Sequence, residues 1–450
     1  MKKNINQILG NENNLIIFFT FLIYVSFVLG FYFNENSIGS GRYDSDLEWM
    51  WRNFEIYKTN DLWTSIHHPD FFGNRTPLLY IFHILLNPFI INIDSYRFTV
   101  FCISFLAPVI FYFCLVQKFK NIDKTILFFI SSFILLSPYY RTSAYWGMEM
   151  NYGIICLLAS IFFLNYSLYK NIDSKLKLYF SLTLLTFFSS LCLYFDQKLL
   201  IIPLIVLFEI LRSKINLRYK IFCLINYCIF AIPFLYLIYI WEGIAPPATQ
   251  IANPDQGTHL SGINLHLFHI GYASAIMAFY LIPILFLKVG NIVNVFKNFF
   301  SEKKNLYKVL VFLIYLIYII FFDNFDDFTK EFDPDVRWGL GILHKVSLIL
   351  FNNSFYGEIF TYFSFFISWI IILVAIEKKI INYIVIFYFY FLSVLLLPLM
   401  QEYFDPYILL FSLLILDVKF EFKFQKVLSV FLYLIVFLSA CNLYYLTKFS

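Results

Sequence analysis

Charged side chains are scarce in this chain. Of its 450 residues, only 14% are Asp, Glu, Lys or Arg, whereas 60% are hydrophobic. Soluble globular domains carry about 25% charged residues, so this composition excludes a soluble domain and predicts an all-α integral membrane protein with many spans. The net charge of +4 says little about partners, because its distribution matters more than its sum, and no nucleic-acid partner is expected.

Several chemical signatures are missing as well. The seven cysteines form no CxxC pair, and nearly all lie within apolar runs, which predicts small buried side chains rather than disulfides or zinc ligands. The sequence contains no glycine-rich loop of the ATP-binding type and no visible internal repeat. Phe, Ile, Asn, Lys and Tyr are in excess over Ala and Gly, which is typical of an AT-rich bacterial genome.

What the chain has in abundance is long apolar stretches. A helix needs about 20 apolar residues to cross the hydrocarbon core of a bilayer, and about thirteen stretches qualify as expected spans. The first stretch is too long for the core of a signal peptide and lacks a small-residue cleavage site, so we expect an uncleaved anchor. The expected spans are 15–33, 96–117, 125–139, 148–169, 177–194, 198–211, 219–241, 269–288, 306–322, 356–376, 381–398, 404–417 and 425–446.

The basic residues predict the topology of these spans. With Lys2 and Lys3 inside, every basic cluster falls in an inward loop, provided that residues 77–91 do not cross the membrane. We therefore expect 77–91 to be a helix on the outer leaflet. This leaves one membrane domain, 1–450, in the bacterial inner membrane, with a cytoplasmic N-terminus. Its outward loops are 34–95, 140–147, 195–197, 242–268, 323–355 and 399–403.

The first outward loop is unusually long and carries most of the polar chemistry. Its first part has the apolar spacing of an amphipathic helix at Leu47, Met50, Trp51, Phe54 and Tyr57. Around this helix the loop holds Asp44, Asp46, Glu48, Trp49, Trp63, His67, His68, Asp70 and Arg75. Carboxylates, imidazoles and indoles gathered directly after the first span indicate chemistry at the outer membrane face.

Six short segments, in this order and on this side of the membrane, resemble a known family. They are Tyr43-Asp44-Ser45-Asp46-Leu47-Glu48, Arg75-Thr76-Pro77-Leu78-Leu79-Tyr80, Ser95-Tyr96-Arg97, Ser137-Pro138-Tyr139-Tyr140-Arg141 with Glu149, Asp196-Gln197-Lys198, and Gln401-Glu402-Tyr403. Together they look like the GT-C superfamily of integral-membrane glycosyltransferases, in the branch of protein mannosyltransferases and lipid A aminoarabinose transferases. The resemblance covers the first 210 residues and the rest only by topology. Glu402 departs from it, since the family usually has Arg there.

The resemblance implies an activity and a set of site residues. A GT-C-like bundle of about thirteen spans would move a sugar from a polyprenyl-phosphate donor to a lipid, glycan or protein acceptor at the outer face. Asp46, with Asp44 as the close second, would be the catalytic base, and Arg75 would contact the phosphate. His67, His68, Arg141, Glu149, Lys198 and Tyr403 would be further contacts to substrate.

Each of these residues also has an ordinary structural interpretation. Asp44 or Asp46 is equally suited to cap a helix, and Arg75 to extend to the membrane interface beside Pro77. The two histidines are typical of a loop surface. Arg141, Glu149 and Lys198 lie at span ends, where charges line a cavity or anchor a helix, and Glu149 is placed to pair with Arg141. The Asp44-x-Asp46 spacing leaves a divalent cation open as a cofactor, although no metal site is assigned.

Two other classes of membrane protein remain open. A flippase or secondary transporter for a lipid-linked saccharide would be similarly apolar, but it would carry broken helices in related halves and polar sites near the midplane. An O-antigen polymerase or ligase would place its largest outward loop late in the chain, whereas here the largest loop comes first. Membrane lipids are expected partners in every case.

Overall fold

A computed structural model describes residues 12–38, 46–73, 75–169, 174–252, 265–288, 290, 292–322, 340–351, 355–396 and 399–449. Within these ranges the structure is almost entirely helical and contains no β-strand, apart from one isolated bridge between Lys288 and Phe420. The expectation of an all-α chain is confirmed for this part of the protein. The described residues fall into two compact units, which are treated separately below.

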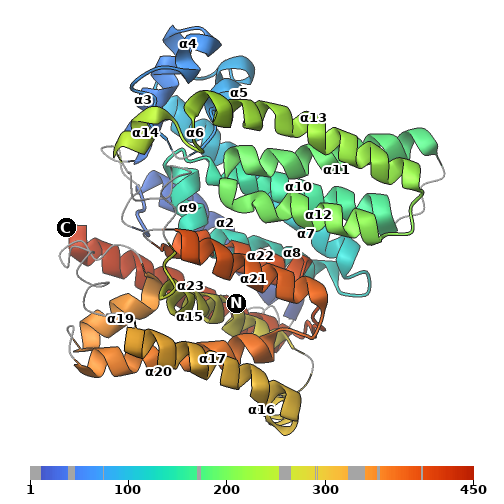
Figure 1. Cartoon of the computed structure of the whole chain (residues 1–450), viewed down its shortest axis with the longest axis vertical. Coiled ribbons are helices and arrows are strands. Elements are labelled where there is room, and N and C mark those ends of the chain that lie inside the picture. Colours follow the sequence, from blue (N-terminus) through green and yellow to red (C-terminus); the bar gives the residue numbers. More distant parts are fainter. Residues whose placement is uncertain are drawn as a thin grey trace, which may run out of the picture. The chain divides into compact units, whose positions relative to one another are not determined.

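The first unit contains the N-terminal half of the chain and the last residues from Leu434 onward. Its elements are α2 (Glu12–Tyr32), α3 (Asp46–Thr59), α4 (Leu62–Ile66), α5 (Leu78–Leu86), α6 (Ile93–Ser104), α7 (Leu106–Lys118), α8 (Lys124–Ser132), η1 (Phe133–Leu136), α9 (Pro138–Tyr145), α10 (Met150–Tyr169), α11 (Lys175–Phe195), η2 (Gln197–Leu200), α12 (Ile201–Arg212), α13 (Leu217–Trp241) and α14 (Pro247–Ala252). Helix α10 packs against α7 and α11, and α11 packs against α13 (Figure 1).

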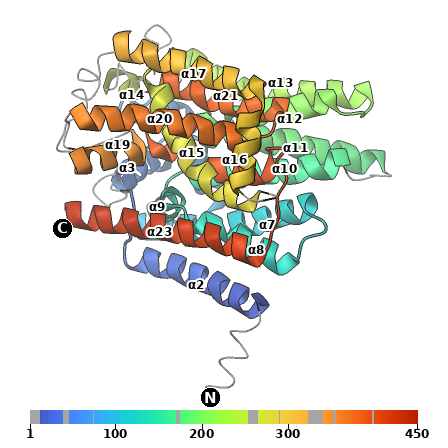
Figure 2. The same cartoon turned by 90° about the horizontal axis from the view of Figure 1, so that it is seen from below.

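The second unit is built around α15 (His269–Leu287), whose side chains are largely buried. Helix α15 packs against α19, α20, α21 and α22. The second view shows α15 next to α20 (Figure 2). The remaining elements are α16 (Ile292–Ser301), α17 (Lys303–Phe322), α19 (Gly341–Phe351), α20 (Phe355–Ala375), α21 (Ile380–Leu395), η3 (Gln401–Tyr403), α22 (Tyr407–Leu414) and α23 (Phe424–Phe449), which continues into the first unit from Leu434.

Nine helical stretches in the described part of the chain are long and apolar enough to cross a membrane. They are Glu12–Tyr32, Ile93–Lys118, Met150–Leu168, Lys175–Phe195, Leu217–Trp241, His269–Leu287, Lys303–Phe322, Phe355–Ala375 and Phe424–Leu446. Several keep large apolar side chains exposed, for example Ile314 and Phe321 on α17. Unlike a soluble surface, a lipid-facing surface is expected to be apolar, so these helices fit a multi-pass membrane protein.

Each of the nine helical stretches coincides with one of the expected spans. The other four expected spans, 125–139, 198–211, 381–398 and 404–417, coincide with the shorter elements α8–η1, α12, α21 and α22. At about 1.5 Å per residue, none of these four reaches the roughly 30 Å of a hydrocarbon core by itself. The segment 77–91, which we expected not to cross, forms the nine-residue helix α5, which is also too short to span.

The first outward loop folds into a compact layer on the end of α13. The amphipathic pattern of α3 is confirmed: Leu47, Phe54 and Tyr57 are buried. A hydrophobic core joins α3 and α5 to the end of α13, and its buried members are Phe54, Tyr57, Phe71, Tyr80, Leu237 and Trp241. The Trp241 indole N–H donates to the Ile66 carbonyl at 3.1 Å, which ties α4 to the same helix.

Two of the expected outward loops differ from their prediction. Residues 140–147 form the end of α9 and a tight turn, and Tyr140 to Trp146 are buried instead of exposed. Helix α9 forms here because Ser137 caps its first turn and Pro138 occupies its first position. Of loop 242–268, residues 247–252 form α14, whose Thr249 side chain is hydrogen-bonded to both backbone groups of Gly73, at 2.8 and 3.0 Å. The acidic stretch 323–335 lies outside the described residues.

Candidate functional site

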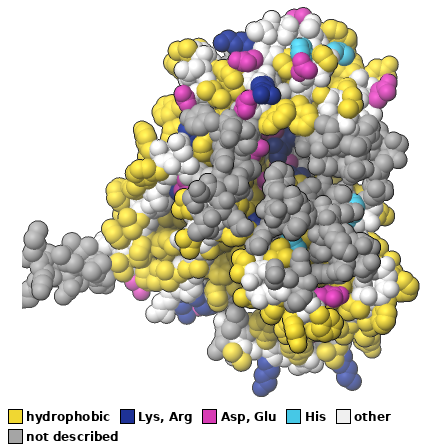
Figure 3. All heavy atoms as spheres, turned by 90° about the vertical axis from the view of Figure 1, so that its left-hand side faces the viewer, with side chains coloured by type: hydrophobic (Ala, Val, Ile, Leu, Met, Phe, Trp, Pro, Cys, Tyr) yellow, Lys and Arg dark blue, Asp and Glu magenta, His cyan; other side chains and the backbone are white. Residues whose placement is uncertain are grey.

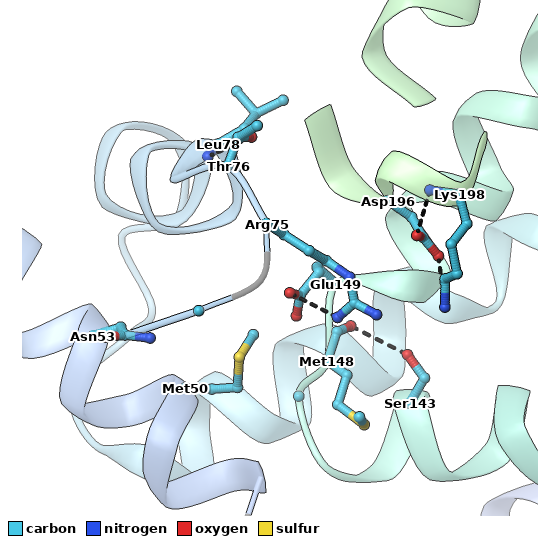
Figure 4. A network of polar contacts seen from close by, with 12 residues as sticks. Met50, Asn53, Arg75, Thr76, Leu78, Ser143, Met148, Glu149, Asp196 and Lys198 are labelled. Carbon is cyan, nitrogen blue, oxygen red and sulfur yellow. Dashed lines mark hydrogen bonds and ion pairs between the residues drawn. The ribbon is translucent and has the colours of Figure 1, made fainter. Parts of the chain in front are cut away.

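Arg75 and Glu149 form an ion pair between the segments that precede α5 and α10 in the first unit. The Arg75 Nη1 atom lies 2.8 Å from the Glu149 Oε1 atom, and the two side chains are only 21% and 11% exposed. Arg75 comes just before α5, and Glu149 directly precedes α10. Figure 4 shows the two side chains pointing toward each other from these two segments. The predicted partner of Glu149 was Arg141, and this pairing is wrong.

The turn between α11 and η2 brings a second pair of opposite charges to the same region. The Lys198 ammonium lies 3.5 Å from the Asp196 carboxylate, which is almost completely buried. Asp196 also caps η2 by accepting the Lys198 backbone N–H at 3.1 Å. This acid lay within the motif that carried the family resemblance but was not singled out as a site residue. The sequence pattern that could have identified Asp196 as a site residue is its position directly before a turn that contains Lys198.

A hydrogen bond from a side chain to a backbone carbonyl links the two segments that carry these pairs. The Thr76 hydroxyl, one residue after Arg75, donates to the Tyr194 carbonyl at 2.5 Å, two residues before Asp196. Gly153, on the first turn of α10, faces the same turn, because a Cβ atom placed there would lie 3.4 Å from the Asp196 Cβ atom. The chain therefore places two cations and two carboxylates around the start of α5 (Figure 4).

The start of α3 lies against the same region. Gly147 adopts a φ of +73°, and a Cβ atom there would lie 2.6 Å from the Tyr96 ring and 3.2 Å from the Leu47 side chain. A glycine is required at this turn for both reasons. Leu47 follows Asp46, and Gly147 is two residues before Glu149, so the first turn of α3 lies against the turn that leads to Glu149.

Tyr80, on α5, connects α3 with this region. Its hydroxyl accepts the Asn53 amide N–H at 3.1 Å and donates to the Met50 sulfur at 3.4 Å. Burial raises the pKa of Tyr80, and the nearby Glu149 carboxylate raises it further. The phenol therefore stays neutral and acts as a fixed dipole in the wall of the site.

His83 is a buried histidine that the sequence interpretation missed. Its Nε2 atom lies 2.7 Å from the Tyr152 hydroxyl, and its Nδ1 atom lies 3.1 Å from the Asn87 amide nitrogen. Burial lowers the pKa of His83 to about 4, so the ring is neutral at physiological pH. An imidazole inside the otherwise apolar run of α5 was the available signal.

Arg141 serves the fold and not an open site. Its Nε atom donates to Glu35 at 2.8 Å, and a second bond from Nη2 to the same carboxylate makes the contact bidentate. The remaining N–H groups donate to Ser26 and to the Leu135 carbonyl. All five guanidinium donors are thereby engaged, so we assign Arg141 to the packing of α9 on α2 instead of the expected contact with substrate.

The two histidines of the first loop lie on the surface side of α4. The His67 Nδ1 atom is 2.8 Å from the Trp63 carbonyl, and its ring lies 4.3 Å from the Trp63 indole. His68 Nδ1 accepts the Asp70 backbone N–H at 3.2 Å, and the Asp70 carboxylate is 3.9 Å away. Within the described ranges, no group of three His, Cys, Asp or Glu side chains is arranged to hold a metal ion.

Three candidate residues remain, and the structure describes two of them, Asp46 and Tyr403. Asp46 is the first residue of α3 and is half-buried, while Asp44 lies outside the described residues. Tyr403 belongs to η3 in the second unit and is half-buried there.

An apolar groove of about 450 Å³ begins at the residue that follows Arg75 in the sequence. Thr76 and Pro77 form part of its lining, and Tyr194, whose carbonyl holds Thr76, forms another part. The other walls come from α4, α5 and α13 and consist of Leu62, Trp63, Ile66, Leu78, Ile81, Pro233, Tyr236 and Leu237. An apolar groove that shares a chain segment with a charged cluster suits an amphipathic ligand with a charged head and a hydrocarbon tail.

Comparisons with protein-family models, with curated proteins and with solved structures find no match to this chain.

Proposed function

We propose that this protein is a GT-C-type membrane glycosyltransferase of about thirteen spans, which moves a sugar from a polyprenyl-phosphate donor to an acceptor at the outer face of a bacterial inner membrane. The observation that carries the proposal is the apolar groove whose lining includes Thr76 and Tyr194. Thr76 directly follows Arg75, and Tyr194 comes two residues before Asp196. This combination provides a place for an isoprenoid chain and cations for the phosphate attached to it.

In this proposal the groove between α4, α5 and α13 holds the first isoprene units. Arg75 and Lys198 contact the phosphate. Glu149 contacts the Nη1 atom of the Arg75 guanidinium, and a planar guanidinium is suited to paired hydrogen bonds with phosphate oxygens. The carboxylates of Glu149 and Asp196 fix both cations before the donor arrives. Preorganised cations of this kind stabilise the charge that develops on a leaving phosphate.

The proposed transfer step is a displacement at the anomeric carbon. The acceptor hydroxyl or amine forms the new bond to this carbon, and the bond from the carbon to the phosphate oxygen breaks. The leaving lipid phosphate keeps the bonding electrons, and the proton of the acceptor goes to the carboxylate of Asp46, or of Asp44 as the second candidate. A general base in this role contributes about 10²- to 10⁴-fold to the rate.

A divalent cation is the alternative partner for the phosphate. Transfer that persists in EDTA supports neutralisation by Arg75 and Lys198 alone. Transfer that EDTA abolishes and Mg²⁺ or Mn²⁺ restores supports a metal-dependent reaction.

The experiment that tests the proposal measures transfer of a radiolabelled sugar from a panel of polyprenyl-phosphate sugars by the purified, reconstituted protein. We expect turnover with at least one donor and a loss of about 10²-fold or more in either Asp46→Asn or Asp44→Asn. A matched control is Asp61→Asn, since Asp61 caps α4 in the same loop and is fully exposed. No turnover with any donor, or turnover that neither substitution changes, would favour a lipid-linked saccharide flippase or an O-antigen polymerase or ligase.

A further inference from the structure

A second cavity lies along α3, next to the hydrophobic core of the loop. It has a volume of about 820 Å³ and is open on one side. Most of its lining comes from α3, and the segment 68–72 and Ala248 complete it. Its volume is within the range of about 300–1,000 Å³ that is usual for small-ligand sites. Figure 3 shows acidic, basic and histidine side chains gathered at this end of the first unit, where α3 and α4 lie.

The Trp49 indole forms part of the lining of this cavity. The Trp49 side chain is 46% exposed, and its ring is held by Phe72, whose ring centre is 4.9 Å away. The Arg52 guanidinium lies 5.4 Å from the centre of the same indole, and it is also held by Glu48 at 2.5 Å. The guanidinium lies over the ring, so the exposed part of the indole has hydrogen-bond donors next to it. Such a surface is suited to a ligand that has an apolar C–H face and hydroxyl groups around it.

The charged groups of the cavity balance each other. Arg52 and Lys58 provide two positive charges, while Glu55 and Asp70 provide two negative ones. Glu55 is fixed in place by the Trp51 indole N–H, which donates to it at 2.9 Å. A lining with hydrogen-bond donors and acceptors but no net charge favours a neutral polyol over an anionic ligand.

The position of this cavity on α3 connects it with the proposed chemistry. Trp49 is three residues after Asp46, and residues three apart lie on the same face of a helix. A ligand that stacks on Trp49 therefore lies one helical turn from the carboxylate proposed as the base.

We propose that this cavity binds a neutral saccharide and that this saccharide is the acceptor of the transferred sugar. Saccharide binding stands on the cavity alone, whereas the role of acceptor rests on the proposed function. The acceptor is thereby narrowed from a lipid, glycan or protein to a glycan, whose hydroxyl next to the Trp49 face receives the sugar.

The test is isothermal titration calorimetry of the full chain in nanodiscs with neutral di- to tetrasaccharides of glucose, galactose, mannose and N-acetylglucosamine. We expect at least one of them to bind. Trp49→Ala should weaken that binding about tenfold or more, which corresponds to about 1.4 kcal/mol, while Trp49→Phe, which keeps an aromatic face, should stay within about threefold. Tyr239→Ala is the matched control, because Tyr239 is an exposed aromatic residue of α13 in the same unit and does not line the cavity.

Binding of none of these saccharides, or binding that Trp49→Ala leaves unchanged, overturns the inference. Sugar transfer measured on the same preparations separates the two proposals. Trp49-dependent binding in a protein without transferase activity keeps the saccharide site and overturns the proposed reaction. Transfer to a saccharide that Trp49→Ala leaves unchanged keeps the reaction and overturns the acceptor site.

Discussion

At the scale of single residues, the main lesson concerns which charges pair. Sequence order placed Glu149 near Arg141, eight positions earlier, and gave no reason to favour another partner. In the structure Arg141 forms an ion pair with Glu35, and Glu149 forms one with Arg75. Glu35 reaches Arg141 because residues 33–38 fold back toward α9. This is a tertiary contact, and no local sequence pattern predicts it. The sequence indicated which charged residues to consider, but it did not indicate how they pair.

The buried pair of Arg141 and Glu35 gives a stability prediction. Arg141→Ala leaves the Glu35 carboxylate buried without its cation, and removal of one partner of a buried pair costs about 3–5 kcal/mol. Thermal unfolding in detergent should show a clearly lower midpoint. Arg212→Ala is the control, since the Arg212 side chain is 63% exposed and lies 3.9 Å from Glu209; exposed pairs contribute about 0–1 kcal/mol. Equal effects of the two substitutions would contradict the structural role of Arg141.

His83 gives a prediction for pH dependence. Burial lowers its pKa from 6.5 to about 4. Between these two pH values the imidazole is protonated in the unfolded chain but stays neutral in the folded protein. Protonation of the unfolded chain therefore lowers the free energy of unfolding as the pH falls from 6.5 toward 4. The loss reaches up to about 3 kcal/mol, and there is none above pH 6.5. Denaturant unfolding of the protein in micelles at several pH values should show this loss.

The matched variant for this measurement is His83→Gln, which keeps a polar side chain but cannot titrate. Its stability should fall less than that of the wild type between pH 6.5 and pH 4, because all other titrating groups are shared. Identical pH profiles for the two proteins would show that His83 does not have a lowered pKa.

At the scale of elements, the first outward loop was the most predictable part of the site. The spacing of apolar residues in α3 predicted the buried face correctly, because a pattern of period 3.6 needs no knowledge of the partner. The sequence placed 77–91 on the outer leaflet and Arg75 at the phosphate, but it did not predict a groove. Its far wall comes from Pro233, Tyr236 and Leu237 on α13, more than 150 residues away, so its shape depends on packing that the sequence does not display.

The groove gives a prediction that compares two positions on one helix. Ile81 lines the groove, whereas Ile84, one turn later on α5, does not. Ile81→Trp should fill the space for the isoprenoid and raise the KM for a long-chain donor about tenfold, with a smaller effect on a short-chain analogue. Ile84→Trp should leave both values nearly unchanged. Equal effects of the two substitutions would show that the lipid lies elsewhere.

At the scale of the whole molecule, hydropathy located the long helices correctly but left the number of crossings open. All nine long apolar helices of the described residues fall on expected spans, while four further expected spans fall on shorter elements. Hydropathy windows average over about twenty residues, so they cannot distinguish one crossing helix from a short helix continued by a turn. The positive-inside count therefore remains a prediction of topology.

Surface labelling in intact cells tests that topology. In a cysteine-free background, Asn60→Cys should react with a membrane-impermeant maleimide, because the end of α3 is expected outside. Lys120→Cys, between α7 and α8, should react only after the membrane is permeabilised, since its basic cluster is expected inside. The opposite labelling pattern would place the Arg75 region in the cytoplasm.

The central claim is that Arg75 holds the phosphate of a lipid-linked donor. The most direct measurement compares sugar transfer from a polyprenyl-phosphate donor by the wild type, Arg75→Lys, Arg75→Gln and the surface control Arg212→Gln. We predict a loss in kcat/KM of about 100-fold or more for Arg75→Gln, partial activity for Arg75→Lys, and no change for the control. A wild-type rate in Arg75→Gln, with the protein folded, would contradict the account.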